Sequence, residues 1–468
     1  MSALHPTGDT APVITSAAPT GRLRTFDLVS AQIGASSPLI VLAGAVTAAL
    51  AISGSLAAPL VYLLVGLGAL LPAALSIARI AHRLPGPGAF YRYATAGLGR
   101  TPGLVAAALA LLSYNAVQIA LYGLLGATLA DLTGLPAPWW VWAGAALVAV
   151  GALGLADIQV SVRVVQVALA AEVIAVGALI GRAILAPADG RSIVGYAFEV
   201  WSPTVLATGG LGVLVAFAIA SFEGFELSPA FAGDAANPAR TVPRALVIAL
   251  TTVAIGYAAA AWALIIVVGP TTVIAAAAQG PALVFSLFGR WGPAVAVVFV
   301  ASVFAAMLAF HSVIARYLAA LGDDAEAPTL FAARNRRGAP VVGSAAQTVV
   351  ALLVVAAFVL TGADPVLGLF TWSSGVAAVS FVTLLVLACA AVIGYHRAHP
   401  CVPGMVAVPV WATLALLALL VVLVGNFDAL IGGDGPLRWA LPGLTLVAIV
   451  GGIGWARLWR RYAARAAQ

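Results

Sequence analysis

The sequence has few charged residues and contains no lysine. Asp, Glu, Lys and Arg together make up 8% of the 468 residues, whereas hydrophobic residues make up 63%. A soluble domain has roughly 25% charged and about 45–50% apolar residues, so this composition excludes an ordinary soluble fold. The lack of lysine, with arginine in every basic position, indicates coding bias and no particular chemistry. The scarcity of charge predicts a multi-pass protein embedded in the lipid bilayer.

Cysteine and the motifs of common enzyme classes are also scarce. The two cysteines, Cys389 and Cys401, have neither metal-ligand spacing nor the even framework of a disulfide scaffold. The sequence has no HExxH, GxSxG or GxxxxGKS/T pattern, so we expect no enzyme activity, no metal site and no cofactor. The net charge of +6 is spread over short loops between apolar runs, which argues against nucleic-acid binding.

Twelve apolar runs are long enough to cross a bilayer as helices. An even number of spans places both termini on one side, and the positive-inside rule makes that side the cytoplasm. The arginines then left outside are Arg182, Arg191, Arg290 and Arg438. The runs lie at about residues 27–52, 57–80, 103–130, 138–157, 160–186, 205–232, 243–268, 291–320, 341–361, 366–395, 406–426 and 438–458.

The sixth run contains two acidic residues, Glu223 and Glu226, with Gly224 between them. A carboxylate at mid-depth costs roughly 2.5–3.5 kcal/mol on insertion scales, so ionisable residues inside a span usually serve a function. Gly224 lets a helix unwind, which hydrocarbon tolerates only where the freed main chain lines a protein cavity. We therefore predict a broken helix at a binding site; a purely structural role for the two glutamates is the alternative.

The first run contains a similar interruption, the patch QIGASSP from Gln32 to Pro38. Proline removes a main-chain donor, while Gly and Ser allow the backbone to open; an ordinary proline kink is the alternative. With both interruptions, runs 1–5 and runs 6–10 each begin with a broken helix. Five spans per half place the halves in opposite orientations, which is typical of an inverted-repeat transporter with its site at the midplane. This inference depends on position, because the halves share no evident sequence identity.

Other runs contain further polar residues. Tyr114, Gln118 and Tyr122 share one helical face, where they either contact a substrate or bind neighbouring helices. Glu172 lies near mid-depth without a basic residue close by, so we expect it to carry a proton. A lone histidine such as His311 is more often a packing residue than a proton relay.

Three stretches resemble the amino acid–polyamine–organocation (APC) permeases. Pro85–Gly99 (PGPGAFYRYATAGLG) resembles a cytoplasmic loop of the family, and FHSVIARYLAALGDDAEAP from Phe310 resembles the end of its eighth helix. The most specific stretch is SFEGFELSPAFAGDAANPARTVPRA from Ser221, which is similar to the sixth-helix signature, Phe-x-Gly-Phe-Glu followed by Asn-Pro-x-Arg-x-x-Pro-Arg. The resemblance implies an all-α membrane protein of twelve transmembrane helices, a LeuT-like 5+5 inverted repeat, and discontinuous helices 1 and 6.

The resemblance also implies roles for residues at the two interruptions. Main-chain amides of the opened first helix are expected to bind the substrate carboxylate, as at any helix N-terminus. Glu226 aligns with a glutamate that takes part in proton-linked gating. The carboxylate-binding segment comprises Gly34, Ala35, Ser36 and Ser37, and the segment that accepts the amino group comprises Phe222, Glu223, Gly224 and Phe225.

The chain departs from the family pattern in three places. Glu172 stands where many members carry a lysine that substitutes for a sodium ion, so either a proton or sodium remains open as the coupling ion. Ala35-Ser36-Ser37-Pro38 replaces the usual Gly-Ser-Gly-Ile and makes the first helix stiffer. Glu223 stands where most members have an aliphatic residue, and an ionised carboxylate there would favour a cationic substrate.

Together these features predict a secondary active transporter of the bacterial cytoplasmic membrane that moves an amino acid by proton-coupled symport or exchange. A carrier of polyamines or other amines is the alternative suggested by Glu223, and a channel or receptor scaffold is the alternative from another class. The sequence leaves the substrate and the oligomeric state open. The expected organisation is a flexible cytoplasmic tail, a transporter core with two repeats (about 25–186 and 205–396), two additional helices and a cytoplasmic tail, at residues 1–24, 25–396, 397–460 and 461–468.

Overall fold

The computed structural model describes residues 23–81, 83–84, 88–156, 162–188, 200–207, 209–226, 235–398 and 406–466. Helices dominate these ranges, and extended pairing within them is limited to two isolated bridges, Leu23 with Ala235 and Arg334 with Pro340. The described chain is therefore all-α, as the composition predicts. Most of the tail expected at residues 1–24 lies outside the described residues, as does Cys401, while Cys389 is a buried free thiol.

Ten helical stretches of the described chain are long and apolar enough to cross a membrane. Two shorter apolar helices, α8 (Trp139–Leu155) and α11 (Leu211–Phe222), lie within the fourth and sixth predicted runs. The number of twelve spans therefore stays a prediction. The ten stretches are Thr25–Ser53, Ala58–Ala81, Arg100–Thr133, Arg163–Leu185, Pro238–Val268, Gly289–Asp323, Val341–Leu360, Pro365–Ala398, Ala407–Gly425 and Leu437–Trp459.

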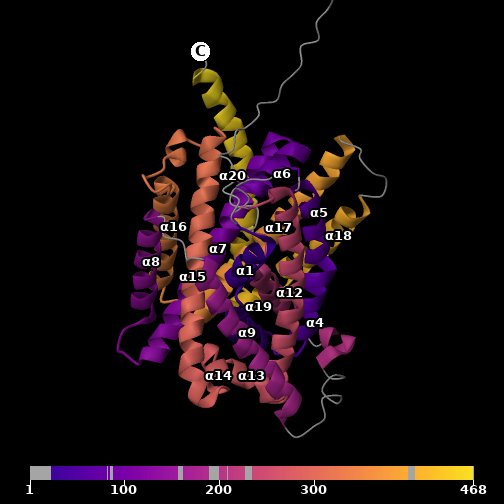
Figure 1. Ribbon diagram of the computed structural model, residues 1–468, viewed down its shortest axis with the longest axis vertical. Helices are drawn as coiled ribbons and strands as arrows, with labels where there is room; N and C mark the ends of the chain where they lie inside the picture. The colour runs from indigo at the N-terminus through magenta and orange to yellow at the C-terminus, as the bar shows by residue number, and fades with distance from the viewer. Residues whose placement is uncertain are drawn as a thin grey trace, which may run out of the picture.

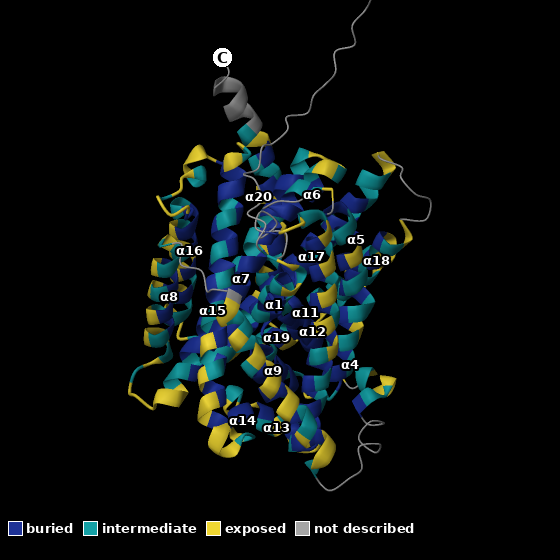
Figure 2. Cartoon of the chain, viewed as in Figure 1, coloured by how far each residue is buried: buried dark blue, intermediate teal, exposed yellow. Residues whose placement is uncertain are grey.

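The helices form one bundle whose centre is filled by apolar side chains (Figures 1 and 2). At its core, α7 (Arg100–Thr133) packs against α15 (Gly292–Asp323), α17 (Thr371–Ala398) and α20 (Leu437–Ala466). Because α20 continues to Ala466, the predicted tail at 461–468 is largely helical. The other main helices are α4 (Ala58–Leu63), α5 (Leu71–Ala81), α6 (Ala89–Leu98), α9 (Val162–Leu185), α12 (Pro238–Val268), α13 (Val273–Ala277), α14 (Pro281–Ser286), α16 (Val341–Leu360), α18 (Ala407–Gly425) and α19 (Phe427–Ile431).

The first membrane helix is interrupted at Ser37. Helix α1 (Thr25–Ser36) ends there because Ser37 has a φ of 23°, and Pro38 has no N–H to continue the helical ladder. The chain resumes as α2 (Pro38–Ile40), a π-helical segment η1 (Val41–Val46) and α3 (Thr47–Ser53). The break predicted within Gln32–Pro38 is thus present, at the end of that patch.

The sixth predicted run is interrupted at Glu223. Helix α11 ends at Phe222, Glu223 has φ −59° and ψ 130°, and Gly224 has a φ of 118°. A Cβ atom at Gly224 would lie 2.7 Å from Ser36 Oγ, so glycine is needed both for the backbone angle and for the close approach. The two interrupted segments therefore contact each other, as expected for broken helices facing one another. Residues 227–234, which continue this run, lie outside the described residues.

Three ion pairs join the helix ends at one end of the bundle. Arg92 of α6 pairs with Asp324 at 3.1 Å, Arg100 of α7 with Glu326 at 2.6 Å, and Arg334 with Asp323 at 2.5 Å. The hydrogen bond from Arg334 to Asp323 raises the pKa of the arginine side chain. The segment after α15 thereby ties α6 and α7 to the loop before α16. The loop after the second run contains the short helix α6; residues 85–87 before it lie outside the described residues.

Candidate functional site

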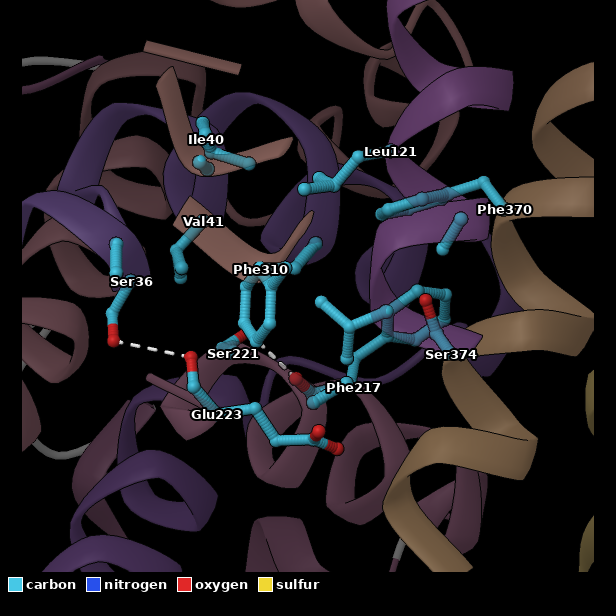
Figure 3. Close-up of a pocket in the computed structure, with 16 residues that line it drawn as sticks. Ser36, Ile40, Val41, Leu121, Phe217, Ser221, Glu223, Phe310, Phe370 and Ser374 are labelled. Carbon is cyan, nitrogen blue, oxygen red and sulfur yellow. Dashed lines mark hydrogen bonds between the residues drawn. The ribbon is translucent and has the colours of Figure 1, made fainter. Parts of the chain in front are cut away.

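A small cavity lies in the centre of the bundle, next to both helix breaks (Figure 3). Its volume is about 50 Å³. Main chain and short side chains of α1 and α11 form one end, and larger apolar side chains form the opposite walls. The lining residues are Ala35, Ser36, Ile40, Val41, Ala45, Val117, Ala120, Leu121, Phe217, Ala220, Ser221, Glu223, Ala306, Phe310, Phe370 and Ser374.

Side chains from one segment bind the main chain of the other at the two breaks. Ser36 Oγ donates to the carbonyl of Glu223 at 3.2 Å, and Gln32 Nε2 donates to the carbonyl of Phe225. The hydroxyl of Tyr257, on α12, donates to the carbonyl of Ser36 at 2.7 Å. Carbonyl groups released by the breaks therefore have partners inside the protein, which a bilayer requires.

Glu172, on α9, binds the start of the second half of the first helix. Its Oε2 accepts hydrogen bonds from Ser37 Oγ at 2.7 Å and from the main-chain N–H of Leu39 at 3.2 Å. Its Oε1 accepts a hydrogen bond from Ser302 Oγ of α15. The carboxyl group thus joins three helices and occupies a helix N-terminus, where negative charge is favoured.

The main-chain amides expected to bind a substrate carboxylate are placed differently from the prediction. Gly34, Ala35 and Ser36 lie within α1, and the donors beyond the break are taken by Glu172, which accepts from Leu39, and by Ser37 Oγ, which accepts from Ile40. A Cβ at Gly34 would lie 2.5 Å from Val165, so this residue serves packing against α9. Helix α1 continues to Ser36, further than the resemblance implies. The amides freed by the break therefore lie after Ser37, next to Glu172.

Glu223, which lines the cavity, and Glu226, which does not, are both buried at the second helix break. Glu223 Oε2 accepts a hydrogen bond from Ser113 of α7 at 2.7 Å, and Glu226 Oε2 accepts one from the N–H of Gly224 at 3.0 Å. The remaining oxygen of each carboxyl group is buried without a partner among the described residues. The Tyr114 phenol is close enough to interact with Glu226, and the two carboxyl groups are close enough to influence each other. This arrangement can hold a proton or a small cation.

The structure separates the predicted site residues into two groups. Gln118 bonds to Tyr122 and accepts a hydrogen bond from Gln347 of α16, which is the interhelical role given as the alternative. Phe222 packs against Tyr62 and Tyr257. Ala35, Ser36 and Glu223 line the cavity, whereas Gly34, Ser37, Tyr114, Gln118, Phe222, Gly224 and Phe225 do not. His311 bonds to Ser344, consistent with a packing role.

Several cavity residues carry no sequence signal. Phe217, Phe310, Phe370 and Leu121 are apolar residues in apolar helices, so composition cannot distinguish them from other core residues. Ser113 precedes Tyr114 directly, and its small hydroxyl side chain gave no indication that it binds Glu223.

A larger cavity of about 690 Å³ lies toward the end of the bundle that carries α13 and α14 (Figure 1). The segment η1, helix α7 and the π-helical segment η8 (Pro365–Phe370) contribute residues to both cavities. Gly44, Leu124 and Phe370 pack closely together: a Cβ added at Gly44 would lie 2.9 Å from the Leu124 side chain and 3.7 Å from the Phe370 side chain. Gly44 and Leu124 line the larger cavity and Phe370 lines the small one, so these three neighbouring residues lie between the two cavities, and we call them the constriction.

Replacing Gly224 with alanine should destabilise the fold. A side chain at positive φ costs about 1–2 kcal/mol, and the new Cβ would meet Ser36 Oγ. Thermal unfolding in detergent measures the loss. The control is Gly256→Ala in α12, where a Cβ meets nothing within 4 Å, so that variant should be as stable as the original protein or slightly more stable. Equal melting temperatures for the two variants would contradict this account of the break.

Replacing Glu172 with alanine should destabilise the protein more than replacing it with glutamine. Alanine leaves the donors of Ser37, Leu39 and Ser302 without an acceptor, at about 1–3 kcal/mol for a buried group, while glutamine keeps one carbonyl oxygen. Thermal unfolding ranks the variants, with Val173→Ala, whose side chain is exposed on the outside of α9, as the control. An alanine variant as stable as this control would refute the linking role.

Comparison with known proteins identifies the family of the chain. The family model described as amino acid permease matches residues 23–450, which include both helix breaks and the central cavity. A search of curated proteins gives no significant match. Because the family model covers most of the chain, the protein belongs to the amino acid permease family of the APC superfamily.

Proposed function

We propose that the protein is a secondary active transporter that moves an amino acid across the cytoplasmic membrane of a bacterial cell by alternating access. The observation that carries the proposal is the meeting of two interrupted helices, at Ser37 and at Glu223–Gly224, beside a small central cavity. Interrupted helices at mid-depth are the usual place of a transporter site, because unwound main chain is tolerated only where it lines a cavity. Family membership supports transport of an amino acid.

The proposed architecture is a LeuT-like inverted repeat of twelve membrane helices with both termini in the cytoplasm. The interrupted segments α1 and α11 would begin the two halves, and α18 and α20 would be the two helices added after the core. The paired arginines Arg92, Arg100 and Arg334 would lie on the cytoplasmic side, as the positive-inside rule prefers.

In this proposal the larger cavity is the extracellular entrance. It lies toward the end of the bundle with α13 and α14, opposite the C-terminus (Figure 1), and its lining includes the acidic residues Asp131 and Asp364. The constriction of Gly44, Leu124 and Phe370 closes the central cavity from this side. Transport then requires that these residues separate while the cytoplasmic side stays shut, followed by the reverse.

We assign proton coupling to Glu226, with Glu172 as a second candidate. Glu226 lies on the unwound segment next to Glu223, and its buried Oε1 has no partner among the described residues. Glu172 instead accepts three hydrogen bonds, which favour its ionised form. Each of two nearby buried carboxyl groups disfavours ionisation of the other, which gives the pair a reason to take up a proton. Sodium is the alternative coupling ion.

Replacing Glu226 with glutamine should uncouple transport from the proton gradient. Because glutamine cannot release or bind a proton, uptake into proteoliposomes should no longer accelerate when the outside is acidified, while exchange of labelled for unlabelled substrate continues. The control is Asp434→Asn, an exposed acid in the loop before α20, which should keep the acceleration. If the glutamine variant responds to acid as the original protein does, Glu226 is not the coupling residue.

Uptake of labelled amino acids into proteoliposomes tests the function itself. Saturable accumulation against a concentration gradient is expected of a secondary transporter. A current that grows linearly with voltage and does not saturate with substrate would favour the channel alternative. Failure of every amino acid to accumulate or exchange, with accumulation of a polyamine, would favour the organic-cation alternative.

A further inference from the structure

We propose that the central cavity selects amino acids with a neutral, apolar side chain, and that Phe310, Phe370 and Leu121 set this preference. The inference rests on the proposed function and names its substrate class. It also reverses the expectation that Glu223 favours a cationic side chain. The evidence is the chemistry of the walls, the direction of the Glu223 carboxyl group, and the bonding of the nearby hydroxyl groups.

The walls away from the helix breaks are apolar. Leu121 of α7, Phe310 of α15 and Phe370 of η8 line them, together with Val41. Phe370 also contacts Phe217 of α11, with ring centroids 5.8 Å apart, so aromatic surface continues across two elements. Among the described lining residues, Glu223 is the one ionisable side chain. A charged substrate group against these walls would lose water without gaining a partner.

The carboxyl group of Glu223 does not compensate for this apolar lining. In Figure 3 its carbonyl oxygen is directed toward Ser36, while its carboxyl group extends to the other side, away from Ile40 and Val41. Its Oε2 is bound by Ser113, and its Oε1 has no appreciable accessible surface. Glu223 therefore contributes main chain to the cavity and keeps its carboxyl group behind the wall.

Most hydroxyl groups near the cavity already form hydrogen bonds within the protein. Ser36 donates to the carbonyl of Glu223, and Ser221 bonds to the carbonyl of Phe217 at 2.6 Å and to the Tyr62 hydroxyl at 2.9 Å. Ser374 has no hydrogen bond within the described chain and remains available to a substrate. The cavity thus offers the Ser374 hydroxyl group to the polar part of a substrate and an apolar space to its side chain.

A competition panel tests the proposed selectivity. Leucine, valine and phenylalanine should compete for uptake and raise the melting temperature of the purified protein, while arginine, lysine, glutamate and putrescine should do neither. Affinity should rise about fourfold for each methylene added from alanine until the walls are reached. Preference for a cationic or acidic amino acid would overturn the inference but leave amino acid transport intact. Binding of no amino acid at all would overturn both.

Wall variants test which residues set the preference. Phe310→Leu should enlarge the space and raise competition by tryptophan relative to leucine about fourfold, the factor expected for one extra buried methylene. The matched control is Phe299→Leu on the same helix, a buried phenylalanine that packs against Phe285 outside the cavity. Leu121→Ala is a second test if Phe310→Leu does not fold. A ratio that changes equally in the control would overturn the assignment.

Replacement of Glu223 separates the two explanations of selectivity. If its carboxyl group lies behind the wall, Glu223→Gln should keep competition by leucine and phenylalanine within about twofold of the original values and leave arginine and lysine without effect, whatever happens to the rate. A loss of binding by cationic amino acids in this variant, together with their binding to the original protein, would show that Glu223 sets selectivity and would overturn the inference.

Discussion

A main-chain N–H or C=O group inside a bilayer has to find its partner within the protein, because hydrocarbon offers none. The two helix breaks release such groups at mid-depth, and the surrounding helices supply the partners. Glu172 accepts from Leu39, Tyr257 donates to Ser36, and Gln32 donates to Phe225. These contacts come from α9, α12 and α1, so the position of each break depends on helices distant in sequence. The cavity exists because the bundle can satisfy an interrupted backbone.

Charge and apolar surface are kept apart around that cavity. The carboxyl groups of Glu172 and Glu223 are bound by hydroxyl groups of Ser37, Ser113 and Ser302, behind or beside the site. Aromatic and aliphatic side chains form the walls. A buried carboxylate among such walls would be costly, whereas one held by hydroxyl donors is tolerated. In the proposed mechanism, the same arrangement would keep the ion-binding and substrate-binding parts adjacent but distinct, which coupling between them requires.

The sequence predicted the breaks because glycine, proline and acidic residues are conspicuous within apolar runs. Ser37 and Gly224 both adopt a positive φ, 23° and 118°, which interrupts the regular turns of the two helices. Partners across the bundle could not be predicted in this way. The spacing of Tyr114 and Gln118 correctly places them on one helix face, yet which helix covers that face is decided by tertiary packing against α16. Phe310 and Phe370 could not be identified from the sequence, because an apolar residue that lines a cavity follows the same sequence pattern as one that fills the core.

The π-helical segments η1 and η8 give the constriction between the two cavities a particular kind of freedom. A π turn holds one residue more than an α turn, and its wider hydrogen-bonded ring packs less tightly. Moving that extra residue along the helix would rotate the side chains it passes by about 100°, without unfolding the span. Phe370 ends one such segment and Gly44 lies inside the other. Such a shift would turn the Phe370 ring aside while its helix stays in place. It requires one hydrogen-bonded turn to rearrange, and the helix does not have to tilt as a rigid body.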